Sequence, residues 1–328
     1  MSTKNSVFKV AAQTLVAAAA VVLPWSAAHA QGAYPKGPVR LIVPYAPGGG
    51  TSYVAQLIGQ ELTKNWGQNV LVDNRPGGNT VVGTVAALKS APDGHTLLFT
   101  TATHVLNQWV TKDLPFDPIA DITPISLLAT SVHLMVVPPS LGVSTLKEFL
   151  AYARANPGKL NYGSSGHGAI SHLAVELFKQ MGKVDLAHVP YKGTSQVLAD
   201  LLSGQIQFTA GAIAAVMPLV KSGKLKAIGV STAARSKHAP DVPTVAEGGI
   251  PGYDVASWYA ISGPPKLPRE IVIRLNETIG KILATPEVSE FFDKQGVDVA
   301  YSSPEAFAKI LKADIDMWSR ISKVVTIQ

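Results

Sequence analysis

The chain has 328 residues, of which 47% are hydrophobic, and its formal net charge at pH 7 is +6. That length is typical of two domains of about 150 residues each, and the apolar content can supply a large core. The basic residues are scattered rather than clustered with aromatic side chains, which excludes the usual pattern of a nucleic-acid-binding protein. The chain contains no cysteine, which excludes disulfides, thiolate zinc sites and a lipid anchor on cysteine.

The first thirty residues have the pattern of an export signal. Lys4 and Lys9 precede the largely apolar run Val10–Leu23, and Ala28-His29-Ala30 supplies small residues at the cleavage positions. The run is too short for a stable membrane span, which needs about 20 apolar residues. We therefore expect a signal peptide at 1–30, cleaved after Ala30, and a mature chain that is soluble and periplasmic.

After the signal, short β-branched runs alternate with helical patterns, which is typical of parallel α/β sheets. A first block predicts strand 39–43, helix 51–67, strand 70–72, a helix around 81–86 and strand 96–100. A second block predicts strand 133–137, a helix that Thr145 and Glu148 begin as a capping box, strand 160–164, helix 171–181, strand 185–189, helix 195–202, and strands 206–210 and 226–231.

The C-terminal part of the chain is predicted to return to the first block. Strand 258–262 is followed by three helices that begin near Pro268, Pro286 and Pro304, because proline is favoured in the first helical turn. We expect one lobe of residues 31–130 plus 253–328 and a second of residues 131–252. Two chain crossings, near 125–132 and 248–256, would join them.

Four loops that are rich in glycine and small hydroxyls stand between a predicted strand and the next helix. They are Pro47–Ser52, Pro76–Thr80, Ser164–Gly168 and Gly193–Ser195. Loops at the carboxyl ends of parallel strands form the ligand crevice of open α/β sheets. Each loop leads into a helix N-terminus, whose unpaired N–H groups favour anions. Any single loop also fits an ordinary turn, but together they predict a receptacle for carboxylate or phosphate.

Enzyme motifs are absent from the sequence. The segment beginning at Gly163 is not a G-x-S-x-G nucleophile elbow, because His167 takes the place of the second glycine. There is no phosphate-binding P-loop, no dinucleotide fingerprint and no H-E-x-x-H metal motif. His167 and His172 are five residues apart and do not share a helix face. We expect no catalytic residue, no metal site and no cofactor, with a hydrolase that uses Ser165 and a histidine as the alternative.

Several motifs occur in a recognisable order. They are VPYAPGGGT, NRPGGN, APDGHTLL, NPGKLNYGSSGHG, HVPYKGTSQVLADLLSGQIQ, GKLKAIGVST, PDVPTVAEGGIPGY and Trp258. Over essentially all of 34–328 the chain resembles the tripartite tricarboxylate transporter solute receptors, or Bug receptors. The resemblance implies a type II periplasmic binding fold, in which two α/β lobes joined by two crossing strands enclose a carboxylate-bearing ligand.

The resemblance also implies which residues face the ligand. Backbone and hydroxyl groups of the first two loops would hold one carboxylate, partly through ordered waters. The matching positions in the first lobe are Tyr45, Gly48, Gly49, Thr51, Gly78 and Asn79. Those in the second lobe are Ser164, Gly166, His167 and Gly168, with Ala212 and Ile213 as a further lining segment.

Two positions depart from the family pattern. Ser52 and Gln56 stand where the family usually has an aspartate and an arginine, which could change selectivity or a local ion pair. Serine still favours the start of a helix, so we expect the fold to be unaffected. Arg75 is interpreted as a brace for its loop, and Lys192 as a solvent-exposed residue. His133 and His188, in predicted strands, are interpreted as core or rim histidines.

The expected partners follow from the same resemblance. They are a small carboxylate ligand and the membrane components of a tripartite tricarboxylate transporter, and we expect a monomer without nucleic acid. An enzyme that reuses the cleft, or a receptor that serves signalling rather than uptake, remains the alternative.

Overall fold

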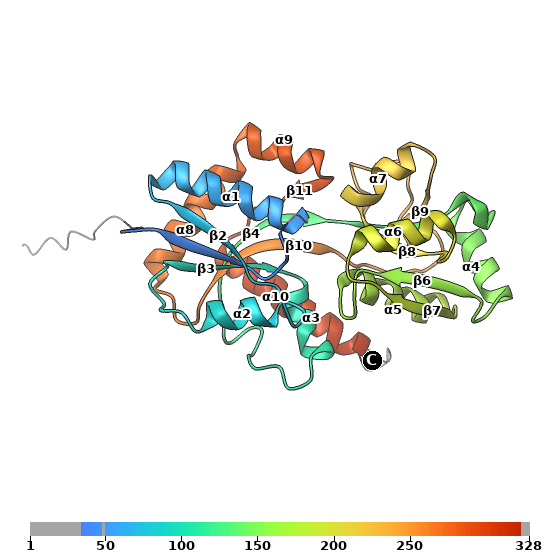
Figure 1. Ribbon diagram of the computed structural model, residues 1–328, viewed down its shortest axis with the longest axis horizontal. Coiled ribbons are helices and arrows are strands. Elements are labelled where there is room, and N and C mark those ends of the chain that lie inside the picture. The colour runs from blue at the N-terminus through green and yellow to red at the C-terminus, as the bar shows by residue number, and fades with distance from the viewer. Residues whose placement is uncertain (1–33, 48–49, 323–328) are drawn as a thin grey trace, which may run out of the picture. The chain divides into compact units, whose positions relative to one another are not determined.

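The computed structural model describes residues 34–47 and 50–322 (Figure 1). From Gly37 onward the chain forms one compact unit. The predicted signal peptide and its cleavage site lie outside the described residues.

The first sheet contains six strands in the order β11-β4-β10-β3-β1-β2. Their bounds are β1 Val39–Val43, β2 Val70–Asn74, β3 Thr96–Thr101, β4 Thr123–Ser131, β10 Ser257–Gly263 and β11 Val297–Val299. Strand β1 pairs in parallel with β2 and β3, whereas β10 pairs antiparallel with β3 and β4. The parallel strands therefore end at one edge of the sheet, where the loop after β1 enters the next helix.

Six helices of the described residues alternate with or follow the strands of the first sheet along the chain. They are α1 Gly50–Trp66, α2 Val81–Leu88, α3 Thr103–Val110, α8 Arg269–Leu283, α9 Pro286–Lys294 and α10 Pro304–Ser322. Helix α1 buries Val54, Ile58 and Leu62 at helical spacing, so one apolar stripe is removed from water.

Five further strands make two smaller sheets, with the orders β8-β5-β9 and β6-β7. Their bounds are β5 His133–Val137, β6 Leu160–Ser164, β7 Leu186–Pro190, β8 Thr209–Ala212 and β9 Lys226–Val230. Backbone hydrogen bonds from Gly163 N to Phe208 O and from Gln207 N to Asn161 O join them. The two small sheets therefore form one continuous layer in the order β7-β6-β8-β5-β9, which is called the second sheet from here on.

The chain around the second sheet forms the 3₁₀ turn η1 Pro139–Leu141 and helices α4 Leu146–Ala155, α5 Ile170–Gly182, α6 Thr194–Ser203 and α7 Ile213–Lys221. In the core, Phe149 stacks on Phe208 with ring centroids 4.6 Å apart, and Phe178 packs against both.

Two chain segments connect the sheets. Val132 is the single residue between β4 and β5, and Ser257 at the start of β10 pairs with Ser131 at the end of β4. Ser231 Oγ accepts a hydrogen bond from His133 N and donates one to Val255 O. One buried serine thus holds the two connections together.

Helix α10 reaches both cores. Phe307 and Leu311 near its beginning pack with Trp258 of the first sheet. Trp318 and Ile321 near its end belong to the buried cluster that contains Phe178 of the second. The apolar face of this helix is therefore divided between two cores.

Some elements differ from the sequence prediction. Helix α3 and strands β4 and β11 were not predicted. The α4 cap forms as predicted on one side, with Thr145 Oγ1 accepting from Glu148 N at 3.2 Å. Glu148 Oε2 instead accepts from Ser144 N at 2.7 Å, one residue before the expected partner.

Candidate functional site

Hydroxyl groups gather where β1 and β3 end. Tyr45 follows β1 and its hydroxyl is hydrogen-bonded to Thr101 Oγ1, at the last position of β3. Thr101 pairs in register with Tyr259 of β10. Thr51, in the first turn of α1, lies near the Tyr259 hydroxyl and acts to lower its pKa. The sequence predicted Tyr45 and Thr51 for this site, and the fold adds Thr101 and Tyr259.

The two tyrosines remain protonated at neutral pH. Desolvation, with a smaller contribution from the neighbouring Tyr45, raises the pKa of Tyr259 to about 12. Desolvation also raises the pKa of Tyr45, against the smaller effects of hydrogen bonds with Thr101 and Thr103. Both phenols can therefore donate a hydrogen bond to an anion. Gly48 and Gly49 of the adjoining loop lie outside the described residues.

The loop before α2 is held in an unusual conformation. Asn79 and Thr80 have φ angles of 50° and 80°, which is rare for a β-branched residue such as Thr80. Buried Asn107 of α3 fixes this conformation, since its Nδ2 donates to Asn79 O and to Thr80 Oγ1 at 2.8 and 2.9 Å. Asn107 Oδ1 accepts in turn from Asn79 Nδ2 at 2.8 Å. The predicted site residues Gly78 and Asn79 thus sit on a loop whose shape α3 determines.

The predicted loop of the second sheet follows β6. Ser164 is buried and its Oγ lies 2.7 Å from His188 Nε2 of β7. Gly168 N donates to His172 Nδ1 at 3.2 Å, while His167 is exposed. Gly166 and Gly168 have φ angles of 142° and 71°, which only glycine adopts readily. The loop therefore has a defined shape that depends on two histidines outside it.

A small cavity of about 50 Å³ opens beside this loop. It is lined by His133, Ser165, Ile170, Ser171, Thr194, Val197, Leu198, Thr209, Ala210, Gly211 and Ala212. Four of these side chains carry hydroxyls, and His133 Nδ1 is buried without a partner. The cavity includes the predicted residue Ala212, whereas Ile213 is fully buried beneath it. The sequence indicated a core or rim histidine at His133, not a residue that lines a cavity.

The loops of the two sheets meet at Gly168. A Cβ atom added there would lie 2.9 Å from Asn79 Nδ2 and 2.6 Å from Val110 Cγ2. A second contact joins Gly296, at the turn between α9 and β11, to Ile213, since an added Cβ would lie 2.9 Å from Ile213 Cγ2. Two pairs of segments from different sheets therefore approach closely, and each includes predicted site residues.

Ser52 and Gln56, which depart from the family pattern, are both accommodated without an ion pair at their side chains. Ser52 is fully buried and its Oγ accepts a hydrogen bond from Asn74 Nδ2 at 3.2 Å. Gln56 is exposed on the outer side of α1. Arg75 Nε donates to Asp73 Oδ2 at 2.9 Å, in agreement with a bracing role. Asn74 therefore provides the polar partner of the serine.

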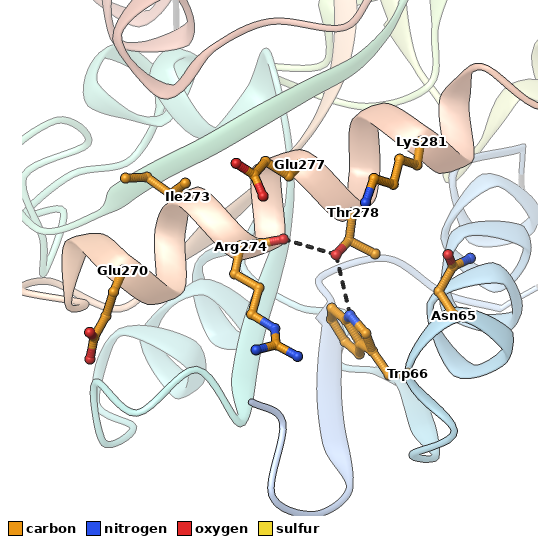
Figure 2. A pocket seen from close by; sticks show the side chains of 8 residues that line it. All are labelled: Asn65, Trp66, Glu270, Ile273, Arg274, Glu277, Thr278 and Lys281. Carbon is orange, nitrogen blue, oxygen red and sulfur yellow. Dashed lines mark hydrogen bonds between the residues drawn. The ribbon is translucent and has the colours of Figure 1, made fainter. Parts of the chain in front are cut away.

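The hollow shown in Figure 2 lies elsewhere, between the end of α1 and helix α8. It measures about 430 Å³ and is lined by Asn65, Trp66, Glu270, Ile273, Arg274, Glu277, Thr278 and Lys281. Trp66 Nε1 donates to Thr278 Oγ1 across it at 3.4 Å. None of the predicted site residues contributes to this hollow, and its charged rim mixes both signs.

The sequence profile of the family described as "TctC: Tripartite tricarboxylate transporter family receptor" matches residues 54–327. The chain belongs to this family. Members of the TctC family are solute-binding receptors rather than enzymes, and their fold is the α/β fold of periplasmic binding proteins. The resemblance noted in the sequence is therefore confirmed.

Solved structures of family members agree. The chain is 34% identical to R. palustris Rpa4515 with adipate, with a TM-score of 0.81 over 89% of this chain and 98% of the other. It is 30% identical to MatC (Rpa3494) from Rhodopseudomonas palustris with bound malate, with a TM-score of 0.79 over 88% of this chain and 99% of the other. It is 28% identical to the periplasmic binding protein BugD, with a TM-score of 0.79 over 89% of this chain and 99% of the other. The TctC receptor described here thus shares its fold with receptors that bind dicarboxylates. In the described part of the chain, helices fall short of the length and hydrophobicity that crossing a membrane requires.

Proposed function

We propose that this receptor holds a small dicarboxylate between the two sheets, which act as the two lobes of a clamp. The first lobe comprises 31–130 plus 253–328 and the second comprises 131–252. The approach of Gly168 to Asn79 carries this proposal, because it brings the predicted loops of both lobes together.

One carboxylate is assigned to the hydroxyl cluster of the first lobe. Tyr45, Thr51 and Tyr259 offer hydroxyl donors beside the beginning of α1, where unpaired N–H groups favour an anion. Hydrogen bonds to a charged group contribute about 1.5–3 kcal/mol each, so a few of them support micromolar affinity without an arginine.

The second lobe is assigned the far end of the ligand. Ser165, Thr194 and His133 line its cavity with polar groups, and the Ser164–Gly168 loop forms one side. Relatives that bind adipate and malate support a ligand with two carboxylates. Among the described residues, neither the hydroxyl cluster of the first lobe nor the lining of the second-lobe cavity contains a carboxylate. A buried ammonium group would need a nearby anion, so we propose a ligand without an ammonium group.

A thermal-shift screen of the mature chain against mono-, di- and tricarboxylic acids tests this function. A ligand that binds only the native state raises its stability by about 2.7 kcal/mol at 100 times Kd. We expect the largest shift from a dicarboxylate, and a smaller one from its 2-amino analogue and from its monoamide. A panel without any stabilising carboxylate would contradict the proposal, and turnover of an ester or carboxylate would favour the hydrolase alternative.

Export and partners complete the proposal. We propose that cleavage after Ala30 releases a periplasmic monomer that delivers its ligand to membrane components of a tripartite tricarboxylate transporter. Intact-mass measurement on periplasmic protein tests the cleavage. A deletion strain tests the role, since impaired uptake of the ligand supports transport, whereas unimpaired uptake with a lost transcriptional response supports signalling.

A further inference from the structure

Three histidines from separate segments meet beneath the loop that follows β6. His167 lies on that loop, His172 in the first turn of α5 and His188 on β7. One ring nitrogen from each lies within 4.8 Å of the others. The rings of His172 and His188 stack with centroids 4.1 Å apart, and His167 meets both edge-on at 5.5 and 5.0 Å. Within residues 34–47 and 50–322, they form the single group of three potential metal-binding side chains this close.

Burial favours the neutral form of two of these imidazoles, those of His172 and His188. Desolvation, with smaller contributions from the neighbouring His167 and Lys179, lowers the pKa of His172 to about 4. The pKa of His188 is lowered to about 4, first by desolvation and then by the neighbouring histidines. A neutral imidazole keeps a free nitrogen lone pair, which is the form that binds a metal ion.

Hydrogen bonds fix the orientation of His188. Ser164 Oγ lies 2.7 Å from His188 Nε2 and 3.1 Å from Gly166 O, and its one hydrogen can be donated to either. When the hydroxyl donates to Gly166 O, His188 donates from Nε2–H and its Nδ1 carries the lone pair. Metal-binding histidines are commonly oriented by such a partner on the other ring nitrogen.

We propose that His167, His172 and His188 bind one divalent transition-metal ion of the zinc class, with a fourth position open to solvent or a ligand. Imidazole nitrogen suits Zn²⁺, Ni²⁺, Co²⁺ and Cu²⁺, whereas Mg²⁺ and Ca²⁺ prefer oxygen ligands. The inference is independent of the carboxylate function, because metal binding alone tests it.

Binding requires a local rearrangement of the loop. Zinc–nitrogen bonds of about 2.0–2.1 Å in a tetrahedral site place nitrogens about 3.4 Å apart, which is closer than the 4.8 Å limit seen here. Exposed His167 can move, because Gly166 and Gly168 flank it. His172 must give up the 3.2 Å hydrogen bond from Gly168 N, since its Nδ1 either binds the metal or carries the proton.

The nearby charges permit a cation. Lys179 is the adjacent positive group, and its Nζ is paired with Glu176 Oε1 at 2.7 Å. Glu176 also accepts a hydrogen bond from Tyr162, whose ring stacks on His188 with centroids 4.8 Å apart. The pair of Lys179 and Glu176 leaves little net charge beside the three rings.

Calorimetric titration of the mature, untagged chain with Zn²⁺ in a carboxylate-free buffer tests the site. Co²⁺ titration adds the visible bands of a tetrahedral centre. We expect one ion per chain, and at least about tenfold weaker binding after His167→Ala, which removes an exposed ligand without disturbing the core. His188→Gln, which can keep the contact with Ser164, should weaken binding to a similar degree. His95→Ala, a histidine in a distant turn, is the matched control and should bind as the native chain does.

Two outcomes would overturn the proposal. One is the absence of saturable Zn²⁺ and Co²⁺ uptake by the native chain. The other is saturable uptake that His167→Ala and His188→Gln leave unchanged, which would place the ion elsewhere. Circular dichroism of each variant shows that the fold persists, so weaker binding can be assigned to the lost ligand.

Discussion

Gly168 and Asn79 come from loops of different sheets and lie so close that a Cβ atom on Gly168 would be 2.9 Å from Asn79 Nδ2. The same atom would be 2.6 Å from Val110 Cγ2 at the end of α3. Glycine is therefore required here for the approach of the two loops as well as for its φ of 71°.

Gly168→Ala should weaken ligand binding at least tenfold, because its methyl group holds the two loops apart. Gly223→Ala is the matched control, since Gly223 has a φ of 72° and its Cβ would meet nothing within 4 Å. Both variants should lose about 1 kcal/mol of stability from backbone strain. Calorimetric titration with the best screened ligand separates them, and equal affinities would show that the contact is irrelevant to binding.

Asn107→Ala should destabilise the protein by about 2–4 kcal/mol, because it leaves Asn79 O and Thr80 Oγ1 without their buried donor. It should also weaken ligand binding, since Thr80 then relaxes from its left-handed conformation. Chemical denaturation and calorimetry measure the two effects. The control Asn65→Ala removes an exposed amide on α1 and should change neither stability nor affinity. If Asn107→Ala binds ligand as tightly as the native chain does, the shape of the Asn79 loop does not determine affinity.

Arg75→Gln should weaken binding by less than tenfold, or about 1.4 kcal/mol. The guanidinium of Arg75 is paired with Asp73 and its side chain is 39% exposed, so it braces the loop rather than gripping the ligand. Titration of this variant beside the native chain decides the point. Complete loss of binding would mean that Arg75 contacts the carboxylate directly.

Asp314→Asn should stabilise the protein above pH 6 and have little effect below pH 4. Desolvation raises the pKa of Asp314 to about 6, despite a hydrogen bond from Trp258 Nε1 at 2.7 Å that an asparagine oxygen can also accept. The folded state therefore binds more protons than the unfolded state between pH 4 and 6, and stability falls as the pH rises through this window. The expected gain of the variant at pH 7.5 is about 1–3 kcal/mol. Urea denaturation at several pH values measures it, and a gain that is independent of pH would rule out ionisation as the cause.

The strands and helices that sequence analysis predicted share strong local signals. Strand 39–43 is a continuous β-branched run, and the helix at 145 has a capping hydroxyl three residues before a glutamate. Helix α3 lacks such signals: its N-cap is Ala102, without a side-chain cap. It forms because Leu106 and Val105 are buried by tertiary packing, which a local pattern does not reveal.

The candidate site was predictable where it lies on strand-to-helix loops and unpredictable where it depends on distant partners. Tyr45 and Thr51 follow a clear strand, and Thr101 ends another, so its hydroxyl could have been included by the same reasoning. Tyr259 enters through antiparallel pairing with a strand far away in the sequence. The histidine cluster was rejected on the spacing of His167 and His172 within one helix. The third member, His188, arrives on a parallel neighbour, and such pairing cannot be read from spacing.

Helix α10 gives the molecule an internal optical reporter. Its beginning packs with Trp258 and its end places Trp318 in the core of the second sheet, so one rigid element is embedded on both sides of the Val132 connection. Any rotation of one sheet against the other must shear the packing around Trp318. The indole environment then changes with the rotation, and the native fluorescence of the chain would follow ligand capture in real time without an attached dye.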